Sequence, residues 1–477
     1  MQNMKHRKHL TTALALALCA ALVCGLLAAC NTATPKKEGE SSTSPVPGVV
    51  EGELTVRIRQ PHAAQAALWQ ALAADYKSLT GVNIELTGAG GATLEGLKES
   101  LKGERAPGVI LFANPSEHQA WKDNAEDLAG SGAYSRLLDP ALALMAGGVP
   151  VAVPLGVHAF GIVYSKPILE AYFALADKGA AFTAIDEVTD FAQLEALVKD
   201  ITLHKAELDI DGAFASPALK EGETATLSHR LLSLPLSYEF RAGNRELTGT
   251  AVNEIEFRNH EAYKGLLDLM LANGGAAPET LQNRTEAHAM AEFADGKAAM
   301  LLGGTELWGR LNTAGSETLR ADDIGIIPAY MNFAAGGGTA GEKIGLALEP
   351  QLYAAINSKG SAEERQAALA FLEWLVSSEK GLDFLGTELN LLAPYTTVTE
   401  DLLPTNPLFA DALRQIRAGG SSVVHLVSAT ALSPGEEYRE THVGAGLAGY
   451  ARGETPWEEF KGNVASKWKE FRERMEY

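Results

Sequence analysis

The chain has 477 residues, 60 of them acidic and 40 basic, and its formal net charge at pH 7 is −20. A surface this acidic repels nucleic acids and anionic lipid headgroups, which argues against a nucleic-acid partner and leaves neutral or cationic ligands open. The length allows a large hydrophobic core and suggests two to three domains.

The beginning of the chain has the pattern of a secretory signal. Three basic residues precede an apolar run over residues 10–27, and small residues follow it up to Cys30. We therefore predict that residues 1–29 are a signal peptide. The alternative is an uncleaved transmembrane anchor, because the apolar run is long enough to span a bilayer.

The signal ends in Leu27-Ala28-Ala29-Cys30, which resembles the lipobox of bacterial lipoproteins. The resemblance implies that a lipid on Cys30 anchors the protein to the outer face of the cell membrane, on the extracellular or periplasmic side. All three cysteines lie at or before Cys30, so the mature chain is expected to have no disulfide. Cleavage removes three basic residues and takes the formal charge to −23. Residues 30–50 have almost no apolar side chains, and we predict a flexible tether.

The next segment predicts an α/β fold. Apolar and polar residues alternate over 54–58, which is typical of a strand, and a helical stripe over 63–79 ends at Gly81. A second alternating strand covers 82–86, and the fully apolar segment 109–112 follows another helical stretch. A continuous apolar strand in this order indicates a parallel sheet with both faces covered.

Ligands of open parallel sheets collect beyond the carboxyl ends of the strands. The loops that follow Ile58 and Phe112 are therefore the first places to look for binding residues. These loops supply four candidates: Gln60, His62, Asn114 and Glu117. A loop asparagine is more often a turn former than a ligand group, and that alternative stays open.

Later segments add further helices. The apolar spacing predicts helices over 191–201, 263–271 and 362–375, and a helix that runs into a strand over 293–302. A final helix begins near Pro456. It carries an aromatic stripe that we assign to core packing rather than to a binding face.

Motifs of known catalytic chemistry are weak. Two strings of the form Gly-x-Gly-x-x-Gly, at 336–341 and 444–449, lack the strand before and the helix after that a dinucleotide site needs, and we interpret both as flexible loops. Ser377-x-x-Lys380 lies at the end of a predicted helix. We expect no catalysis, no cofactor and no metal.

Four segments, in order along the chain, carry a family resemblance. The first comprises 54–56, 74–77 and 80–82, and the second comprises 149–154 and 161–166. The third reads Phe-Ala-Asp-Gly-Lys-Ala-Ala-Met over 293–300, followed by two glycines and a tryptophan; the fourth comprises 353–358, 367–375 and 378–381. Together they resemble the extracellular solute-binding proteins of ATP-driven sugar importers, the group that includes the maltodextrin-binding proteins. Ser165 departs from the usual asparagine of the second motif.

This resemblance implies two α/β lobes, discontinuous in sequence, with a hinge and a ligand cleft between them. We expect residues 51–157 and 325–386 in the N-terminal lobe, and residues 158–324 and 387–477 in the C-terminal lobe. The first crossing is expected near His158 and the return near 324–328. The resemblance also implies a monomer that binds a sugar and delivers it to the permease and ATPase subunits of an ABC transporter.

Six residues become site candidates through the resemblance. His158 occupies a position near the first crossing where family members often have a carboxylate. Glu306 and Trp308 follow the paired glycines, where the family places a stacking aromatic. Aromatic candidates in turn-rich segments are Tyr238, Tyr330 and Phe333. For Trp308 and His158 a purely structural role remains an alternative, and Glu306 is equally compatible with a solvated charge.

Other functions stay open on sequence grounds. A secreted glycoside hydrolase is the main alternative, because paired carboxylates leave no spacing signature in sequence. A surface adhesion module is another, and the bound solute could be a peptide or a polyamine instead of a sugar.

Overall fold

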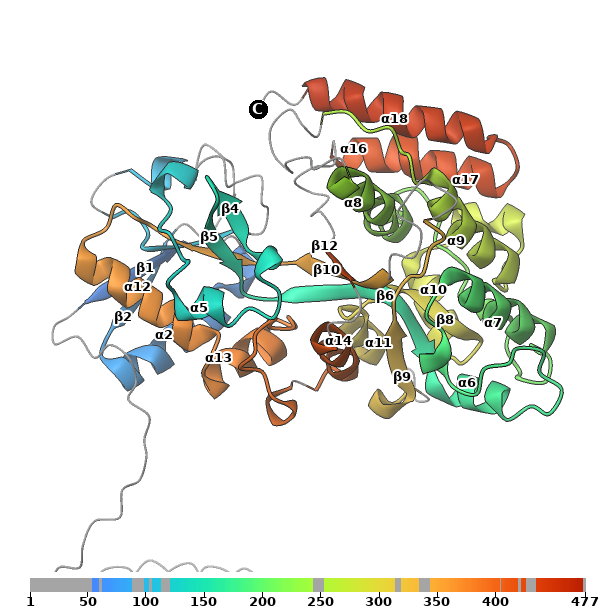
Figure 1. Cartoon of the computed structure of the whole chain (residues 1–477), viewed down its shortest axis with the longest axis horizontal. Helices are drawn as coiled ribbons and strands as arrows, with labels where there is room; N and C mark the ends of the chain where they lie inside the picture. The colour runs from blue at the N-terminus through green and yellow to red at the C-terminus, as the bar shows by residue number, and fades with distance from the viewer. Residues whose placement is uncertain are drawn as a thin grey trace, which may run out of the picture. The chain divides into compact units, whose positions relative to one another are not determined.

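The computed structural model describes eleven stretches of the chain (Figure 1). They are 54–59, 62–87, 98–102, 105–112, 121–242, 253–313, 319–333, 344–403, 405–418, 422–425 and 435–474. The expected signal peptide, Cys30 and the tether lie outside the described residues. None of the helices in the described stretches combines the length and the apolar character that a bilayer crossing requires.

The first sheet has the strand order β2-β1-β3-β11-β5-β4. Its strands are β1 (Thr55–Arg59), β2 (Asn83–Thr87), β3 (Val109–Phe112), β4 (Leu144–Ala146), β5 (Val149–Pro154) and β11 (Tyr353–Ile356). Strand β1 pairs in parallel with β2 and β3, as the sequence predicts, whereas β11 is antiparallel to β3 and β5. The late strand β11 thus completes a sheet that the early strands begin.

Helices cover one face of this sheet, and their buried side chains share one core there. They are α2 (Ala66–Thr80), α5 (Gly132–Ser135), α12 (Ala362–Leu375) and α13 (Glu379–Asp383), with a π-helical turn η10 (Phe384–Glu388). Helix α2 ends where predicted, because Gly81 takes the left-handed conformation, with φ of 79°, that residues with a side chain rarely adopt. The predicted helix 362–375 is confirmed, and Ser361 begins it with a capping box.

The second sheet has the order β12-β10-β6-β8-β7, and β9 also pairs with β6. Its strands are β6 (Val157–Ser165), β7 (Gly212–Phe214), β8 (Ala298–Gly304), β9 (Ile324–Ile327), β10 (Ile344–Pro350) and β12 (Ser422–His425). Figure 1 shows β6 as the long strand that follows β5 and becomes the middle of this sheet.

Many helices pack on the second sheet. They are α6 (Lys166–Phe173), α7 (Phe191–Leu203), α8 (Leu232–Ala242), α9 (His260–Asn273), α10 (Glu286–Ala294), α11 (Leu307–Thr313), α14 (Pro407–Arg417), α16 (Glu436–Tyr438), α17 (Ala445–Ala451) and α18 (Trp457–Arg474). Two π-helical segments, η6 (Thr226–Leu231) and η12 (Arg439–Gly444), precede α8 and α17. The fold is α/β with two lobes, each built on one sheet, as predicted.

The buried side chains that the structure describes form three cores. The first core reaches both sheets and includes Val56, Leu111, Val153, Val157, Leu301, Ile326, Leu348 and Leu413. The second core lies on the other side of the second sheet and includes Phe160, Tyr164, Phe214, Tyr263, Val464 and Trp468. The third core is small and covers the outer face of the first sheet around Phe112 and Trp121. The aromatic stripe of α18 belongs to the second core, which confirms its assignment to packing.

Among the described residues, three segments connect the two sheets. Leu155 and Gly156 join β5 to β6, and residues 351–352 join β10 to β11. These two crossings are bonded to each other, since the Leu155 amide donates to the Leu352 carbonyl at 2.7 Å. The third crossing follows η10 and reaches α14. It is tied to the first where the Val157 amide donates to Leu392.

The expected return crossing near 324–328 is displaced. Strands β9 and β10 both pair with β6, so both strands belong to the second sheet, and the chain returns to the first sheet between Pro350 and Tyr353. The physical reason is that both apolar segments lie along one edge of β6, one beside each half of that long strand. The division of the whole chain into lobes stays a proposal, in which β9 and β10 belong to the second lobe.

One predicted loop is a helix. Gly444, Gly446 and Gly449 belong to η12 and α17, so the flexible loop expected at 444–449 is wrong. The glycines are used for close packing: a Cβ on Gly446 would lie 2.8 Å from the Phe460 ring, and one on Gly449 would meet Thr455. The other glycine string, at 336–341, lies outside the described residues.

Candidate functional site

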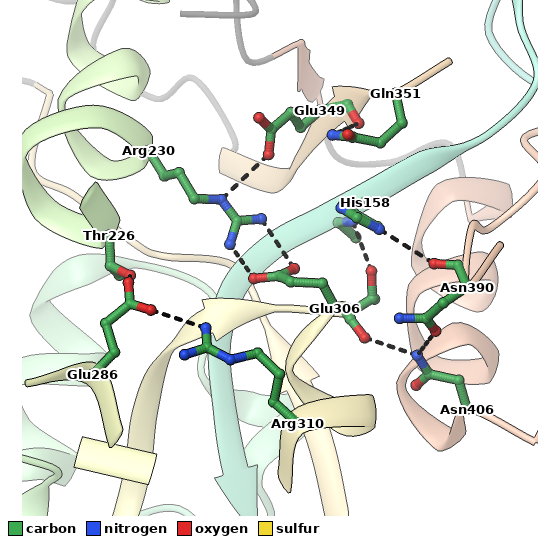
Figure 2. A network of polar contacts seen from close by, with 12 residues as sticks. His158, Thr226, Arg230, Glu286, Glu306, Arg310, Glu349, Gln351, Asn390 and Asn406 are labelled. Atoms are coloured by element: carbon green, nitrogen blue, oxygen red, sulfur yellow. Dashed lines mark hydrogen bonds and ion pairs between the residues drawn. The ribbon is translucent and has the colours of Figure 1, made fainter. Parts of the chain in front are cut away.

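Charged side chains from distant parts of the chain meet where the second sheet begins (Figure 2). Arg230 lies on η6, Glu306 is the second residue after β8, and Glu349 lies on β10. His158, at the start of β6, is the cross-strand partner of Glu349. We call these four residues the junction cluster, because β6 and β10 lead from here into the first sheet.

Arg230 holds the cluster together. Both of its terminal nitrogens bond the Glu306 carboxylate, one of them at 3.0 Å, and its Nε lies 3.2 Å from Glu349 Oε2. The guanidinium carbon also lies 4.7 Å from the centre of the Phe160 ring, a cation–π arrangement. The side chains of Arg230, Glu306 and Glu349 are 14%, 21% and 19% exposed, so the charges are largely withdrawn from water yet still reachable.

The electrostatics of the cluster keep Glu306 ionised. Burial by itself would raise the pKa of Glu306, but attraction to Arg230 and the hydrogen bonds from it outweigh burial and lower the pKa below 4.5. The pKa of Arg230 is raised, because Glu306 and Glu349 more than compensate for its burial. One guanidinium thus faces two carboxylates, and the cluster is formally rich in hydrogen-bond acceptors.

The third crossing is attached to the same place. His158 Nε2 lies 3.2 Å from the carbonyl oxygen of Asn390, a residue with φ of 52° in the left-handed region. Asn406 donates to the Asn390 side chain at 3.1 Å and to the Thr305 carbonyl at 2.7 Å (Figure 2). Thr305 in turn accepts from the Ala159 amide. Thr305, which precedes Glu306, and Ala159, which follows His158, are therefore fixed by hydrogen bonds.

The structure brings together two of the predicted site residues, His158 and Glu306, whereas three of the four aromatic candidates lie in the second core. Trp308, on α11, is half-buried and packs against the first core. The second core contains the other three, Tyr238, Tyr330 and Phe333. The rings of Tyr238 and Phe333 are 4.0 Å apart, and burial, with the nearby Asp186 and Asp190, raises the pKa of Tyr330 to about 12.

Of the four candidates in the loops after the first-sheet strands, only His62 lies among the described residues. Gln60, Asn114 and Glu117 lie outside the described residues. His62 is exposed and directly precedes η1 (Ala63–Gln65). These four residues therefore stay predictions for the side of the site that the first lobe would provide.

Arg230 and Glu349 were not found from the sequence. Arg230 lies 76 residues from Glu306 and 119 from Glu349, so no local spacing connects them. Of these two residues, only Glu349 has a recognisable pattern around it in the sequence. It lies near the end of an apolar strand that stops at a proline, directly before a crossing.

A small cavity lies near the cluster but is too small for a solute. Its volume is about 40 Å³, and Thr226, Glu286 and Arg310 supply its polar side chains. Arg310 donates to Glu286 at 2.9 Å across this wall. Ligand pockets in proteins are about 300–1,000 Å³, so this space suits water and not a sugar.

Comparisons with known proteins indicate the family of this chain. Residues 71–412 match the model of a family described as bacterial extracellular solute-binding protein. The sequence matches no curated protein.

Solved structures share the fold at low sequence identity. A family 1 extracellular solute-binding protein from Alicyclobacillus acidocaldarius has a TM-score of 0.63 and 13% identity, covering 88% of this chain and 98% of its own. RafE from Streptococcus pneumoniae, in an apo form, has a TM-score of 0.59, 14% identity and coverages of 88% and 98%. A family 1 protein from Bifidobacterium longum subsp. infantis has a TM-score of 0.56, 15% identity and coverages of 87% and 99%. The family match spans well over half of the chain and includes strands of both sheets, and the chain therefore belongs to the bacterial extracellular solute-binding proteins.

Proposed function

We propose that this protein captures a carbohydrate between its two lobes and delivers it to the permease of an ABC importer. It would act from the outer face of the membrane, held there by a lipid on Cys30. The observation that carries the proposal is the junction cluster, where Arg230 keeps two partly exposed carboxylates in fixed positions at the root of the second lobe.

Carbohydrate is favoured by the chemistry of this cluster. Sugar hydroxyls donate hydrogen bonds, and the side-chain oxygens of Glu306 and Glu349 are strong acceptors that Arg230 holds in place. Preorganised acceptors lower the cost of ordering side chains on binding. Similar solved structures also favour a sugar, since RafE was solved in complex with raffinose and another neighbour is a chitin oligosaccharide binding protein.

Glycoside hydrolysis fits the cluster poorly. An acid catalyst of that reaction needs a carboxyl group with a raised pKa, so that it holds a proton at working pH. The pKa of Glu306 is lowered, and the carboxylate is committed to both terminal nitrogens of Arg230. Glu306 is therefore suited to binding and not to proton donation.

A ligand screen tests the proposal. The purified protein is heated with raffinose, maltodextrins, chitin oligosaccharides or xylo-oligosaccharides, and with peptides and polyamines as comparison arms. A solute that binds the folded state raises the melting temperature by mass action. We expect at least one oligosaccharide to do so without being cleaved, as chromatography of the mixture would show. A shift with polyamines or peptides alone, or sugar cleavage, would contradict the proposal.

Trp308→Ala tests the proposed stacking residue. We expect at least tenfold weaker binding of the sugar found in the screen, about 1.4 kcal/mol, measured by calorimetry. Trp374→Ala is the matched control, because Trp374 is another half-buried indole that packs on Tyr76 and Phe371 in the first lobe. It should leave the affinity unchanged. If Trp308→Ala also binds normally, Trp308 is a packing residue.

A further inference from the structure

Three metal-ligating side chains converge on the second lobe, away from the junction cluster. Asp177 lies in the loop after α6, His204 caps the carboxyl end of α7, and Glu207 lies in the next turn. One ligand atom from each residue lies within 4.8 Å of the other two. The set of one imidazole and two carboxylates suits zinc, which binds histidine nitrogen and carboxylate oxygen readily.

The distance between two of the ligand atoms fits the tetrahedral coordination of zinc. His204 Nδ1 and Glu207 Oε1 are 3.3 Å apart. Two ligands bound at roughly 2.0–2.1 Å to a tetrahedral zinc are separated by about 3.3–3.4 Å. The competing explanation is a hydrogen bond from a protonated Nδ1, which would make the site an ion pair without metal.

A third carboxylate, that of Asp200, lies next to this set. Asp200 Oδ2 accepts from the Gly179 and Ala180 amides at 2.8 and 3.1 Å, which fixes the loop that carries Asp177. Its other oxygen, Oδ1, lies 3.9 Å from His204 Nε2. This separation is too long for a hydrogen bond, but it puts a carboxylate on the side of the second ring nitrogen, where zinc-bound histidines usually have an outer partner that leaves the Nδ1 lone pair free for the metal.

The end of α7 provides an independent reason to place a cation here. Helix α7 has 13 residues, and its last turn contains no basic side chain. The carboxyl end of a helix carries partial negative charge and favours a nearby cation. His204 is the residue at that end, and its side chain is only 12% exposed.

We propose that Asp177, His204 and Glu207 bind a zinc ion, with Asp200 as the positioning residue behind His204. The ion would join the loop after α6 to the end of α7, and this role is independent of the proposed sugar binding. The described residues contain one rival set, His260, Glu261 and Glu458. It is less suitable, because His260 Nδ1 already accepts a hydrogen bond from the Trp457 indole at 3.0 Å.

Zinc titration of the purified full-length protein tests the site. The double variant Asp177→Asn/Glu207→Gln keeps both side-chain shapes, and both residues are exposed, so it should fold with an unchanged melting temperature in the absence of metal. We expect calorimetry to show one zinc site in the wild type that binds at least tenfold more weakly in the double variant. Zinc should raise the melting temperature of the wild type and not of the variant.

Controls separate this site from other zinc ligands of the chain. The matched control is Glu261→Gln/Glu458→Gln in the rival set, which should bind zinc like the wild type. His6, His9 and the three cysteines lie near the start of the chain and form a background common to all variants. Only the difference between wild type and variants is therefore evaluated. Equal zinc affinity in the wild type and Asp177→Asn/Glu207→Gln, or a protonated His204 ring by NMR with zinc present in excess, would overturn the proposal.

Discussion

Replacing Arg230 with methionine is expected to lower the free energy of unfolding by about 3–5 kcal/mol at neutral pH. The substitution leaves the mostly buried carboxylates of Glu306 and Glu349 without their common partner. Removing one partner of a buried pair costs more than the pair contributes, since the remaining charge keeps its desolvation penalty. Urea denaturation followed by circular dichroism measures the difference.

The loss should depend on pH in a defined direction. In the wild type the pKa of Glu306 is lowered in the folded state, so its stabilising contribution is present above pH 4.5 and is lost as the pH falls through the folded pKa. In Arg230→Met the burial of Glu306 is no longer offset, and its pKa should rise. The variant then gains relative stability as the pH falls from neutral, and the gap to the wild type should narrow.

Arg310→Met is the matched control for this prediction. Arg310 also bonds a glutamate, Glu286, but the two side chains are 49% and 24% exposed. Exposed pairs contribute roughly 0–1 kcal/mol, so the loss should be small and nearly independent of pH. Similar losses for the two variants would show that the junction cluster is no more important than a surface pair.

Gly304→Ala is expected to destabilise the protein by about 1–3 kcal/mol and to weaken sugar binding. A Cβ on Gly304 would lie 2.6 Å from the Ala159 carbonyl oxygen and 2.8 Å from a terminal nitrogen of Arg230, and closer still to Glu306. The carbonyl cannot move easily, because Gly304 pairs with Phe160 in the sheet. The side chains of Arg230 and Glu306 must therefore shift, so the substitution should lower both the stability and the affinity for sugar.

Gly462→Ala controls for the loss of glycine as such. Gly462 lies inside α18, and a Cβ there meets nothing within 4 Å. Alanine in a helix interior is favoured over glycine by about 0.5–1 kcal/mol, so this variant should be slightly more stable. Calorimetric melting of both variants and titration with sugar give the comparison. A Gly304→Ala variant that melts and binds like the wild type would show that the cluster tolerates displacement.

The sequence predicted local elements well, because the signals for them are local. The strand 109–112 and the helix 362–375 are found at the predicted bounds. The helix-to-strand segment over 293–302 is confirmed by α10 and β8. Apolar periodicity, a capping box and a glycine at a helix end each act within a few residues and leave a readable pattern.

The sequence did not predict which of the later strands pair with each other. The segments 324–327 and 344–350 are both apolar, and either could extend either sheet. Their common place along β6 depends on the length of that strand and on packing against it. An apolar run specifies that a strand is buried and not which edge it joins.

The candidate site was predicted only in part. His158 and Glu306 were reached through family motifs, whereas Arg230 and Glu349 were missed, because an isolated charged residue has no local signature and its partners lie far along the chain. Folding brings such distant charged residues together, so their contacts are visible only in the structure. The aromatic candidates illustrate the converse, since Tyr238 and Phe333 pair with each other in the second core instead of facing the junction cluster.

The continuity of the first core limits how the two lobes can part. Its apolar contacts extend from Val56 in the first sheet through Val157 to Leu413 on α14, without a break at the crossings. Pulling the sheets apart on that side would expose this surface to water, which costs about 25 cal/mol for each Å². The two lobes can therefore move apart on the opposite side while this side stays closed. Because the lobes share the first core, we expect thermal melting to unfold both of them in a single cooperative step.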